Sequence, residues 1–379
     1  MSQPDIASPT AEKYLRLHLC QGVGAIRSAC LLRELGGIDA VLNAGSGSLS
    51  SVRGIGRQVA DAIARGRDRA NVDDELERAA RHDVRILCLE DDNYPVALKH
   101  INDPPACLYL RGTLKPEDAV ALAVVGSRRC TRYGAEQAER FAALLAQAGM
   151  TIVSGMARGI DSYAHGGALA ANGRTLAVMG CGLSHVYPPE STELAERIRA
   201  NGAILSELPM DTAPDAGNFP PRNRIIVGLS LGVLVVEAAR RSGALISARL
   251  AVEYNREVFT VPGQIDRPHS AGCHELIKTG GAKLVTDLTD ILEDLGETGA
   301  ALLANRSGEE EARPAPPAVK LDDLEARIAR VLAGEPVSID IICDEAGLPP
   351  ARVAAALTGL QLKGVVRRVG GDLYERTRV

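Results

Sequence analysis

The middle of the chain alternates short apolar runs with helical segments, and this alternation limits the possible folds more than any other feature. Runs that are apolar on both faces are expected to be strands at 121–125, 151–154, 175–179, 203–205, 232–237, 257–261 and 283–285. Helices are predicted between them at 133–148, 160–171, 190–200, 223–229, 244–255 and 286–295. Such strands form a parallel sheet covered by helices on both faces. We therefore predict an α/β domain whose ligand binds beyond the carboxyl ends of its strands.

The segments on either side of this domain have other patterns. Residues 1–80 are expected to be a small helical domain with Gly-x-Gly turns at residues 21–25 and 53–57, in the manner of helix-hairpin-helix units. Such turns can present backbone amides to DNA phosphates, or their glycines can simply permit tight turns. Both interpretations stay open at this stage.

The sheet domain is assigned to residues 81–296, with two added strands at 84–88 and 107–110. Residues 297–320 are rich in Glu, Ala and Pro and are predicted to be a flexible linker. Residues 321–379 contain three helical segments and a hairpin with a Gly-Gly turn, which predicts a winged helix. This segment has eight basic and nine acidic side chains, and phosphate contact needs an excess of basic ones. A role in protein binding or oligomer formation is therefore at least as plausible as DNA contact.

Composition excludes several classes of protein. The formal net charge is −5, so the chain is not a globally basic nucleic-acid binder. It has no apolar run long enough to span a membrane and no signal peptide at its N-terminus. The eight cysteines lack any C-x-x-C spacing, which favours free thiols in a reducing cytoplasm and no zinc site.

Charge is unevenly distributed along the sheet domain. No lysine occurs between Lys115 and Lys278, yet arginines cluster there around glycine turns. These turns follow predicted strands at residues 126–129, 154–161 and 180–182. Junctions of this kind offer free amides at helix starts, so we predict an anion-binding cleft. No Walker lysine and no complete dinucleotide fingerprint are present, so no nucleotide cofactor is expected.

Residues 219–226, Phe-Pro-Pro-Arg-Asn-Arg-Ile-Ile, add an aromatic side chain to this cleft. Arg222 and Arg224 come just before an apolar run and are expected near a helix start, where anions bind. Phe219 beside arginines can stack on a base. The combination favours single-stranded nucleic acid over a small phosphate ligand.

A catalytic role has weaker support. Asp161 and His165 are four residues apart on one predicted helix and could form a general-base pair. The simpler interpretation, which we favour, is that Asp161 caps its helix and His165 lies on a polar face. Glu237, at a strand end, is expected to pair with an arginine. No catalytic residue and no metal ligand is therefore predicted.

Taken in order, the motifs resemble the DprA/Smf (DNA-processing protein A) family over nearly the whole chain. The resemblance rests on residues 92–95, 126–128, 154–161, 180–182, 187–188, 206–207, 219–226, 235–238 and 242–244. It implies an extended Rossmann-like domain between an N-terminal SAM-like or helix-hairpin-helix-like domain and a C-terminal winged helix. It also implies a cytoplasmic, dimeric binding protein, not an enzyme. Such a protein binds and protects single-stranded DNA and loads the RecA recombinase onto it during natural transformation.

The resemblance also implies a DNA-binding pocket of arginine, hydroxyl, amide and aromatic side chains: Ser127, Arg128, Arg158, Phe219, Arg222, Asn223, Arg224 and Ser242. Within it, Arg128 and Arg158 would meet phosphates and Phe219 would contact a base. Two positions depart from the family pattern, His274 in place of an asparagine and Ala244 in place of a serine or threonine.

An enzyme is the alternative. Phosphoribohydrolases that cut nucleoside monophosphates share a related sheet and carry Pro-Gly-Gly-x-Gly-Thr before a catalytic glutamate. Here Pro262 and Gly263 are followed by Gln264, so that motif is only loosely matched.

Overall fold

The structure is a computed structural model that describes residues 6–312, 321–332 and 336–376. Contacts divide the chain into two compact units, Met1–Gly308 and Glu309–Val379, and each is described by itself. In the part of the chain that the structure describes, no helix combines the length and apolar composition that a membrane span needs.

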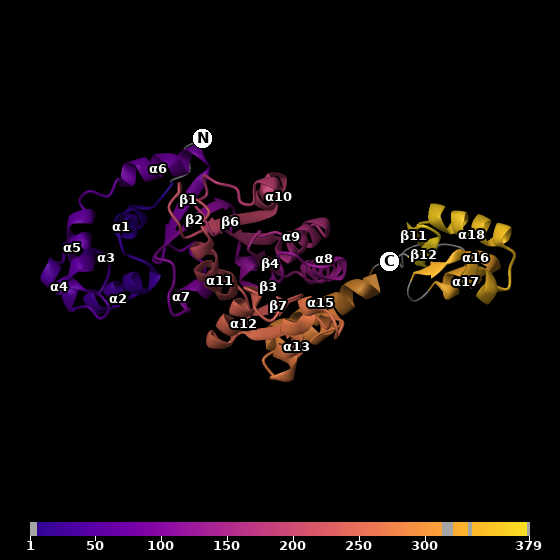
Figure 1. Cartoon of the computed structure of the whole chain (residues 1–379). Helices are drawn as coiled ribbons and strands as arrows, with labels where there is room; N and C mark the ends of the chain where they lie inside the picture. The colour runs from indigo at the N-terminus through magenta and orange to yellow at the C-terminus, as the bar shows by residue number, and fades with distance from the viewer. Residues whose placement is uncertain (1–5, 313–320, 333–335, 377–379) are drawn as a thin grey trace. The chain divides into compact units, whose positions relative to one another are not determined.

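The first unit is built on one nine-stranded sheet (Figure 1). Its strands are β1 (Val84–Cys88), β2 (Cys107–Gly112), β3 (Ala121–Val125), β4 (Thr151–Ser154), β5 (Thr175–Val178), β6 (Gly202–Ser206), β7 (Gly232–Val235), β8 (Glu257–Thr260) and β9 (Lys283–Leu284). Their order is β1-β2-β6-β5-β4-β3-β7-β8-β9. From β6 to β9 all neighbours are parallel, whereas β1 and β2 extend the sheet in antiparallel fashion. The predicted parallel sheet is therefore confirmed.

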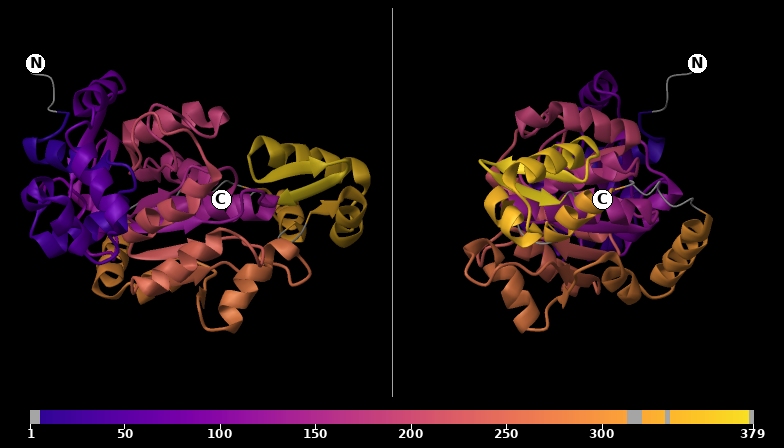
Figure 2. Two further views of the ribbon diagram at one scale, coloured as in Figure 1. Left: turned by 60° about the vertical axis from the view of Figure 1, so that its left-hand side comes forward. Right: turned by 90° about the vertical axis from the view of Figure 1, so that its right-hand side faces the viewer.

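Helices lie on both sides of this sheet (Figure 2). In chain order they are α1 (Pro9–His18), α2 (Ala25–Leu35), α3 (Ile38–Asn43), α4 (Ser46–Ser51), α5 (Arg57–Gly66), α6 (Val72–Arg81), α7 (Val96–Lys99), α8 (Arg132–Gln147), α9 (Ile160–Ala170), α10 (Thr192–Asn201), α11 (Phe219–Gly228), α12 (Ala244–Glu253), α13 (Ala271–Lys278), α14 (Leu288–Asp294) and α15 (Gly296–Ala312). Apolar side chains of α8, α9 and α14 pack on one face of the central strands, and those of α11 and α12 pack on the other. The sheet is thus shielded from water on both faces.

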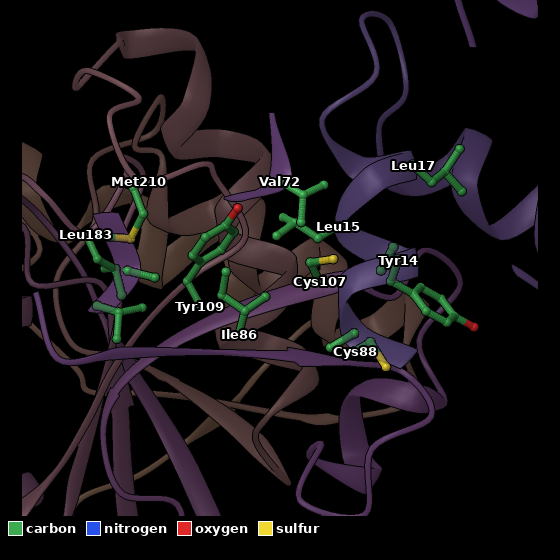
Figure 3. Close-up of a cluster of buried hydrophobic side chains, with 14 of the residues drawn as sticks. Tyr14, Leu15, Leu17, Val72, Ile86, Cys88, Cys107, Tyr109, Leu183 and Met210 are labelled. Atoms are coloured by element: carbon green, nitrogen blue, oxygen red, sulfur yellow. The ribbon is translucent and has the colours of Figure 1, made fainter. Parts of the chain in front are cut away.

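The N-terminal helices share a core with the edge of the sheet. Figure 3 shows Leu15 and Val72 from the helices beside Ile86 and Tyr109 from β1 and β2. The buried carboxylate of Glu75, on α6, accepts a hydrogen bond at 2.8 Å from the Tyr109 hydroxyl, and a second at 2.7 Å from a backbone N–H. Residues 6–80 therefore fold against the sheet, within the first unit. The boundary predicted near residue 80 stays a prediction.

The two glycine turns of this helical segment are present. Gly22 lies between α1 and α2 with φ 82°, and Gly54 lies between α4 and α5 with φ 83°. Side chains other than glycine rarely adopt such angles, so both glycines are needed for the turns themselves. DNA contact at these turns stays a prediction.

Part of the predicted linker is helical. Helix α15 covers Gly296–Ala312, and Leu302 and Leu303 on it pack against the apolar cluster under α8 and α14. The acidic composition suggested a flexible linker. The segment is helical because its alanines and glutamates favour helix and its leucines pack against the sheet unit. The remaining linker residues, 313–320, lie outside the described residues. Helix α13 (Ala271–Lys278) was also not predicted.

The second unit is a winged helix with its own core. It contains α16 (Asp323–Val331), α17 (Ile339–Ala346), α18 (Pro350–Leu362), β10 (Val337–Ser338), β11 (Val366–Gly370) and β12 (Leu373–Arg376). The three strands form a small sheet in the order β10-β12-β11. The predicted three helices and hairpin are confirmed, and the short strand β10 is an addition.

Candidate nucleic-acid interface

A hollow of about 550 Å³ opens at the carboxyl ends of the central strands. Strand β3 pairs with β4 on one side and with β7 on the other. Strands β4 to β6 follow on the first side and β7 to β9 on the second, so the strand order reverses between β3 and β7. Ligands of open α/β sheets bind at this kind of switch point. Six of the predicted site residues line the hollow: Ser127, Arg128, Phe219, Arg222, Asn223 and Ser242. The segment after β3, the start of α11 and the start of α12 bring them together.

Phe219 is surrounded by other side chains of the site. The guanidinium of Arg128 lies 4.8 Å from the ring centroid, and the ring of Tyr187 lies 5.6 Å away at a tilt of 44°. A Cβ at Gly180 would come within 2.8 Å of the ring, so this glycine permits the close packing. Phe219 is therefore half-buried and holds the exposed Arg128 side chain by a cation–π contact.

Arg222 forms the floor of the hollow. It is only 4% exposed and donates hydrogen bonds to the backbone carbonyls of Gly155, at 2.7 Å, and Val178. Burial lowers the pKa of Arg222 to about 10, so the side chain stays charged at neutral pH. A Cβ at Gly155 would lie 2.5 Å from the guanidinium nitrogens. The glycine of the second predicted turn therefore makes room for this arginine.

Two carboxylates of the protein bind backbone N–H groups near the hollow, one at the start of α8 and one in the turn before α9. Glu237 accepts hydrogen bonds from the backbone N–H and the hydroxyl of Thr131, both at 2.8 Å, at the start of α8. Asp161 accepts one at 3.3 Å from the N–H of Ala157, before α9. Asp161 lies within α9 and bonds the turn before it, and α9 has no side-chain cap, so the predicted capping role of Asp161 is wrong. The predicted pairing of Glu237 with an arginine is also wrong. The N–H groups of Thr131 and Ala157 are therefore occupied, each by a carboxylate of the protein.

The start of α12 is different, because it opens into the hollow without a carboxylate cap. The N-cap residue is Gly243, which has no side chain to cap the helix. The hydroxyl of Ser242, one residue earlier, accepts a hydrogen bond from the Ala244 N–H at 3.3 Å. Both residues line the hollow. The positive end of α12 thus adds to the charge of the surrounding arginines.

Two predicted site residues lie elsewhere. Arg158 is exposed and forms a bidentate ion pair with Glu190, at 2.5 and 3.1 Å. Arg224 is 5% exposed and is paired with Glu207 and, at 3.2 Å, with Asp103. The structure therefore does not bring these two arginines into the hollow. Their contact with DNA stays a prediction, as it does for the six residues inside it.

His165 does not lie on a polar face of its helix, as we expected. It is fully buried, and its Nδ1 lies 2.6 Å from the hydroxyl of Thr175 on β5. Burial lowers the pKa of His165 to about 3, so the ring is neutral. Within the described ranges, His, Cys, Asp and Glu side chains do not gather in threes as a bound metal would require.

The lining residues that the sequence-based site omitted include three basic side chains: Arg129, Arg241 and His269. The two arginines are exposed next to predicted site residues, and the arginine clustering was the signal that could have identified them. His269 comes from the segment after β8 and carried no such signal.

Comparison with known proteins agrees with this arrangement. A family profile described as DNA recombination-mediator protein A matches residues 85–296, and one described as DprA winged helix domain matches residues 312–372. The chain belongs to the DNA recombination-mediator protein A family. Membership confirms the resemblance drawn from the motifs and the predicted role in DNA processing and recombination, and it does not favour the phosphoribohydrolase alternative.

Individual relatives cover most of the chain. Protein Smf of Synechocystis sp. is 34% identical over 94% of this chain and 96% of its own. The X-ray structure of DNA processing protein A from Streptococcus pneumoniae superposes with a TM-score of 0.67 at 34% identity, covering 75% of this chain and 97% of that one. A Helicobacter pylori DNA processing protein A, described for its single-stranded DNA binding mode, gives a TM-score of 0.50 at 32% identity over 59% of this chain and 96% of its own.

Proposed function

We propose that this protein binds single-stranded DNA in the hollow at the carboxyl ends of β3 and β7. The observation that carries the proposal is the set of exposed arginines, Arg128, Arg129 and Arg241, around Phe219 in one hollow. Arginine forks bind phosphates with two parallel hydrogen bonds. The Helicobacter pylori relative, with its single-stranded DNA binding mode, supports the same ligand class.

The contacts within the hollow favour a strand over a small anion. The N–H groups of Thr131 and Ala157 are bonded to Glu237 and Asp161, so phosphate binding depends mainly on arginine side chains. Arg128 lies over the ring of Phe219, and a planar guanidinium can also stack on a base. Stacking tolerates any base, because every base has a π-face. We therefore expect binding with little sequence preference.

The same geometry supports a binding protein, not an enzyme. Both oxygens of Glu237 accept hydrogen bonds from Thr131, and the carboxylate is only 4% exposed. His165 is fully buried against β5. His165 is out of reach of a ligand, and both oxygens of Glu237 are occupied, so neither group is placed to act as a general base. Release of a free base from nucleoside monophosphates by the purified protein would contradict this part of the proposal.

We further propose two partners that the motif resemblance implies: a RecA recombinase, which would receive the bound strand, and a second copy of this chain. With RecA present, the protein should shorten the lag before RecA assembles on single-stranded DNA. Sedimentation velocity should give twice the mass of one chain. A monomer would remove the dimer from the proposal and leave the binding site intact.

The binding proposal is tested by removing one arginine from the hollow. Arg128→Ala should weaken binding of a single-stranded oligonucleotide by about 1–3 kcal/mol, because a phosphate contact and a stacking surface are lost together. Fluorescence anisotropy of a labelled oligonucleotide measures the dissociation constant. Equal concentrations of a duplex should compete poorly.

The matched control is Arg197→Ala. Arg197 is an exposed arginine on α10 that does not line the hollow, so the substitution removes the same charge from another surface. It should leave affinity nearly unchanged. Equal losses in the two variants would mean that general charge, and not this hollow, binds the strand.

A further inference from the structure

A second hollow, of about 790 Å³, adjoins the first. It lies between the start of α8 and the segment that follows β8, and His269 lines both hollows. The segment after β3 also passes from one to the other. Arg128 lines the first hollow, and Arg132 and Tyr133, a few residues later, line the second. The two hollows therefore meet at His269, near the carboxyl edge of the sheet.

The second hollow has an aromatic ring in a fixed position. Tyr133 is 46% exposed, and its hydroxyl donates a hydrogen bond at 2.9 Å to the backbone carbonyl of Pro262. This bond joins α8 to the segment after β8, so the ring is held at the wall of the hollow. An exposed tyrosine held in this way is a platform on which a base can stack.

Two exposed arginines lie beside the ring. Arg132 pairs with Glu136 at 2.8 Å, one helical turn along α8, and both side chains are at least half exposed. Arg267 donates to the side-chain oxygen of Gln264 at 3.0 Å. Ion pairs and hydrogen bonds at such exposed positions contribute little in water, so a phosphate can replace them. The hollow thus offers stacking and phosphate contact side by side.

We propose that the second hollow is a further nucleotide subsite, in which the strand bound at Arg128 continues past His269 and stacks a base on Tyr133. The proposal rests on the proposed function, because the occupant is the same strand. Arg132 and Arg267 contact its phosphates. Glu237, buried in the wall, keeps the start of α8 neutral, so the subsite recognises a stacked base and its flanking phosphates more than an isolated anion.

The test uses the length of the ligand. Oligothymidylates of about 4 and about 12 nucleotides both fall within the range of single-strand site sizes. The longer one should bind the full chain more tightly. Tyr133→Ala and Arg267→Ala should each weaken the longer ligand by about tenfold and leave the shorter one nearly unchanged, because stacking contributes at this level per base. Arg128→Ala should weaken both.

Two controls separate a stacking role from a structural one. Tyr133→Phe loses the hydrogen bond to Pro262 but keeps the ring, so it should retain the length dependence. Tyr163→Ala removes a tyrosine of similar exposure, 45%, from α9, outside both hollows. It should change the affinity for neither the shorter nor the longer oligothymidylate.

Several results would overturn the subsite. In one such result, Tyr133→Ala and Arg267→Ala keep the full length dependence while Arg128→Ala loses both ligands. This would refute the subsite in the second hollow and leave the proposed site in the first hollow intact. Failure of the unaltered protein to bind either ligand would instead refute the proposed function. If the two variants changed the sedimentation coefficient and not the length dependence, the hollow would be a surface between copies of the chain.

Discussion

At the scale of single residues, arginines of similar appearance in the sequence have different roles. Arg128 is exposed and stacked on Phe219, where it can meet a ligand. Arg222 is buried and holds two backbone carbonyls together beneath the hollow. Arg224 is buried away from the hollow between two carboxylates. Only the first combines access to solvent with a position inside the site, so we expect substitutions at the three to have separable effects.

Arg224→Ala should destabilise the fold without weakening DNA binding by the folded protein. It would leave the carboxylates of Asp103 and Glu207 partly buried without their counter-charge. Breaking a buried ion pair costs about 3–5 kcal/mol. Urea denaturation should show a loss of about this size in the free energy of unfolding. Anisotropy measured well below the denaturation midpoint should give the affinity of the unaltered protein.

Arg158→Ala is the stability control, because it breaks an ion pair with Glu190 in which both side chains are exposed, and such pairs contribute little to stability. If Arg224→Ala were as stable as Arg158→Ala but bound DNA weakly, the buried ion pair would not be structural, and Arg224 would belong to the binding site.

At the scale of helices and strands, the periodic parts of the sequence predicted the fold well. Strand β3 begins and ends at the predicted residues, and α9 differs by one residue at its end. Burial of both faces of the sheet requires apolar strands between helices, so the alternation can be read from the sequence alone. Helix α15 was missed because its acidic residues suggested a linker, whereas Leu302 and Leu303 pack against the apolar cluster of the sheet unit.

The site was only partly predictable for a geometric reason. Arg222 and Arg224 are two residues apart on α11, and two helical residues are separated by about 200° around the axis. Sequence proximity to a helix start therefore placed both in the hollow, whereas the helix directs them to opposite sides. For Arg158, no feature of the sequence indicated that Glu190, more than thirty residues away, would be its partner.

Helix α9 makes folding sensitive to acid. Burial lowers the pKa of His165 on this helix to about 3, against about 6.5 in the unfolded chain. Between these values the unfolded chain binds a proton that the folded chain does not. The stability is therefore fully present above about pH 6.5 and is lost as the pH falls toward 3.

Lowering the pH from 6.5 to 5 should lower the free energy of unfolding by about 2 kcal/mol through His165 alone. Urea denaturation of the unaltered protein and of His165→Gln at both pH values measures this contribution. The variant should lose less stability on acidification than the unaltered protein. Equal losses would mean that the histidine is protonated in the folded state.

At the scale of the whole chain, the N-terminal helices belong to the core of the sheet unit, whereas the winged helix has a core of its own. The winged helix carries eight basic and nine acidic side chains over residues 321–379. A phosphate-binding surface needs an excess of basic groups. Both observations indicate that single-strand binding belongs to the first unit.

A chain that ends at Ala312 should therefore keep most of its affinity for single-stranded DNA, within about threefold, or about 0.7 kcal/mol. Anisotropy at matched salt concentration compares it with the full chain. A loss of a hundredfold or more would show that the winged helix holds the strand directly. Circular dichroism checks that the shortened chain is folded.

The most direct test is to locate the strand on the protein by photo-crosslinking an oligonucleotide that carries iodouracil and identifying the modified peptides by mass spectrometry. The account predicts crosslinks within residues 126–133, 219–226 and 239–247, which line the hollow or continue from it. Crosslinks confined to the winged helix, or to the glycine turns near residues 22 and 54, would contradict it.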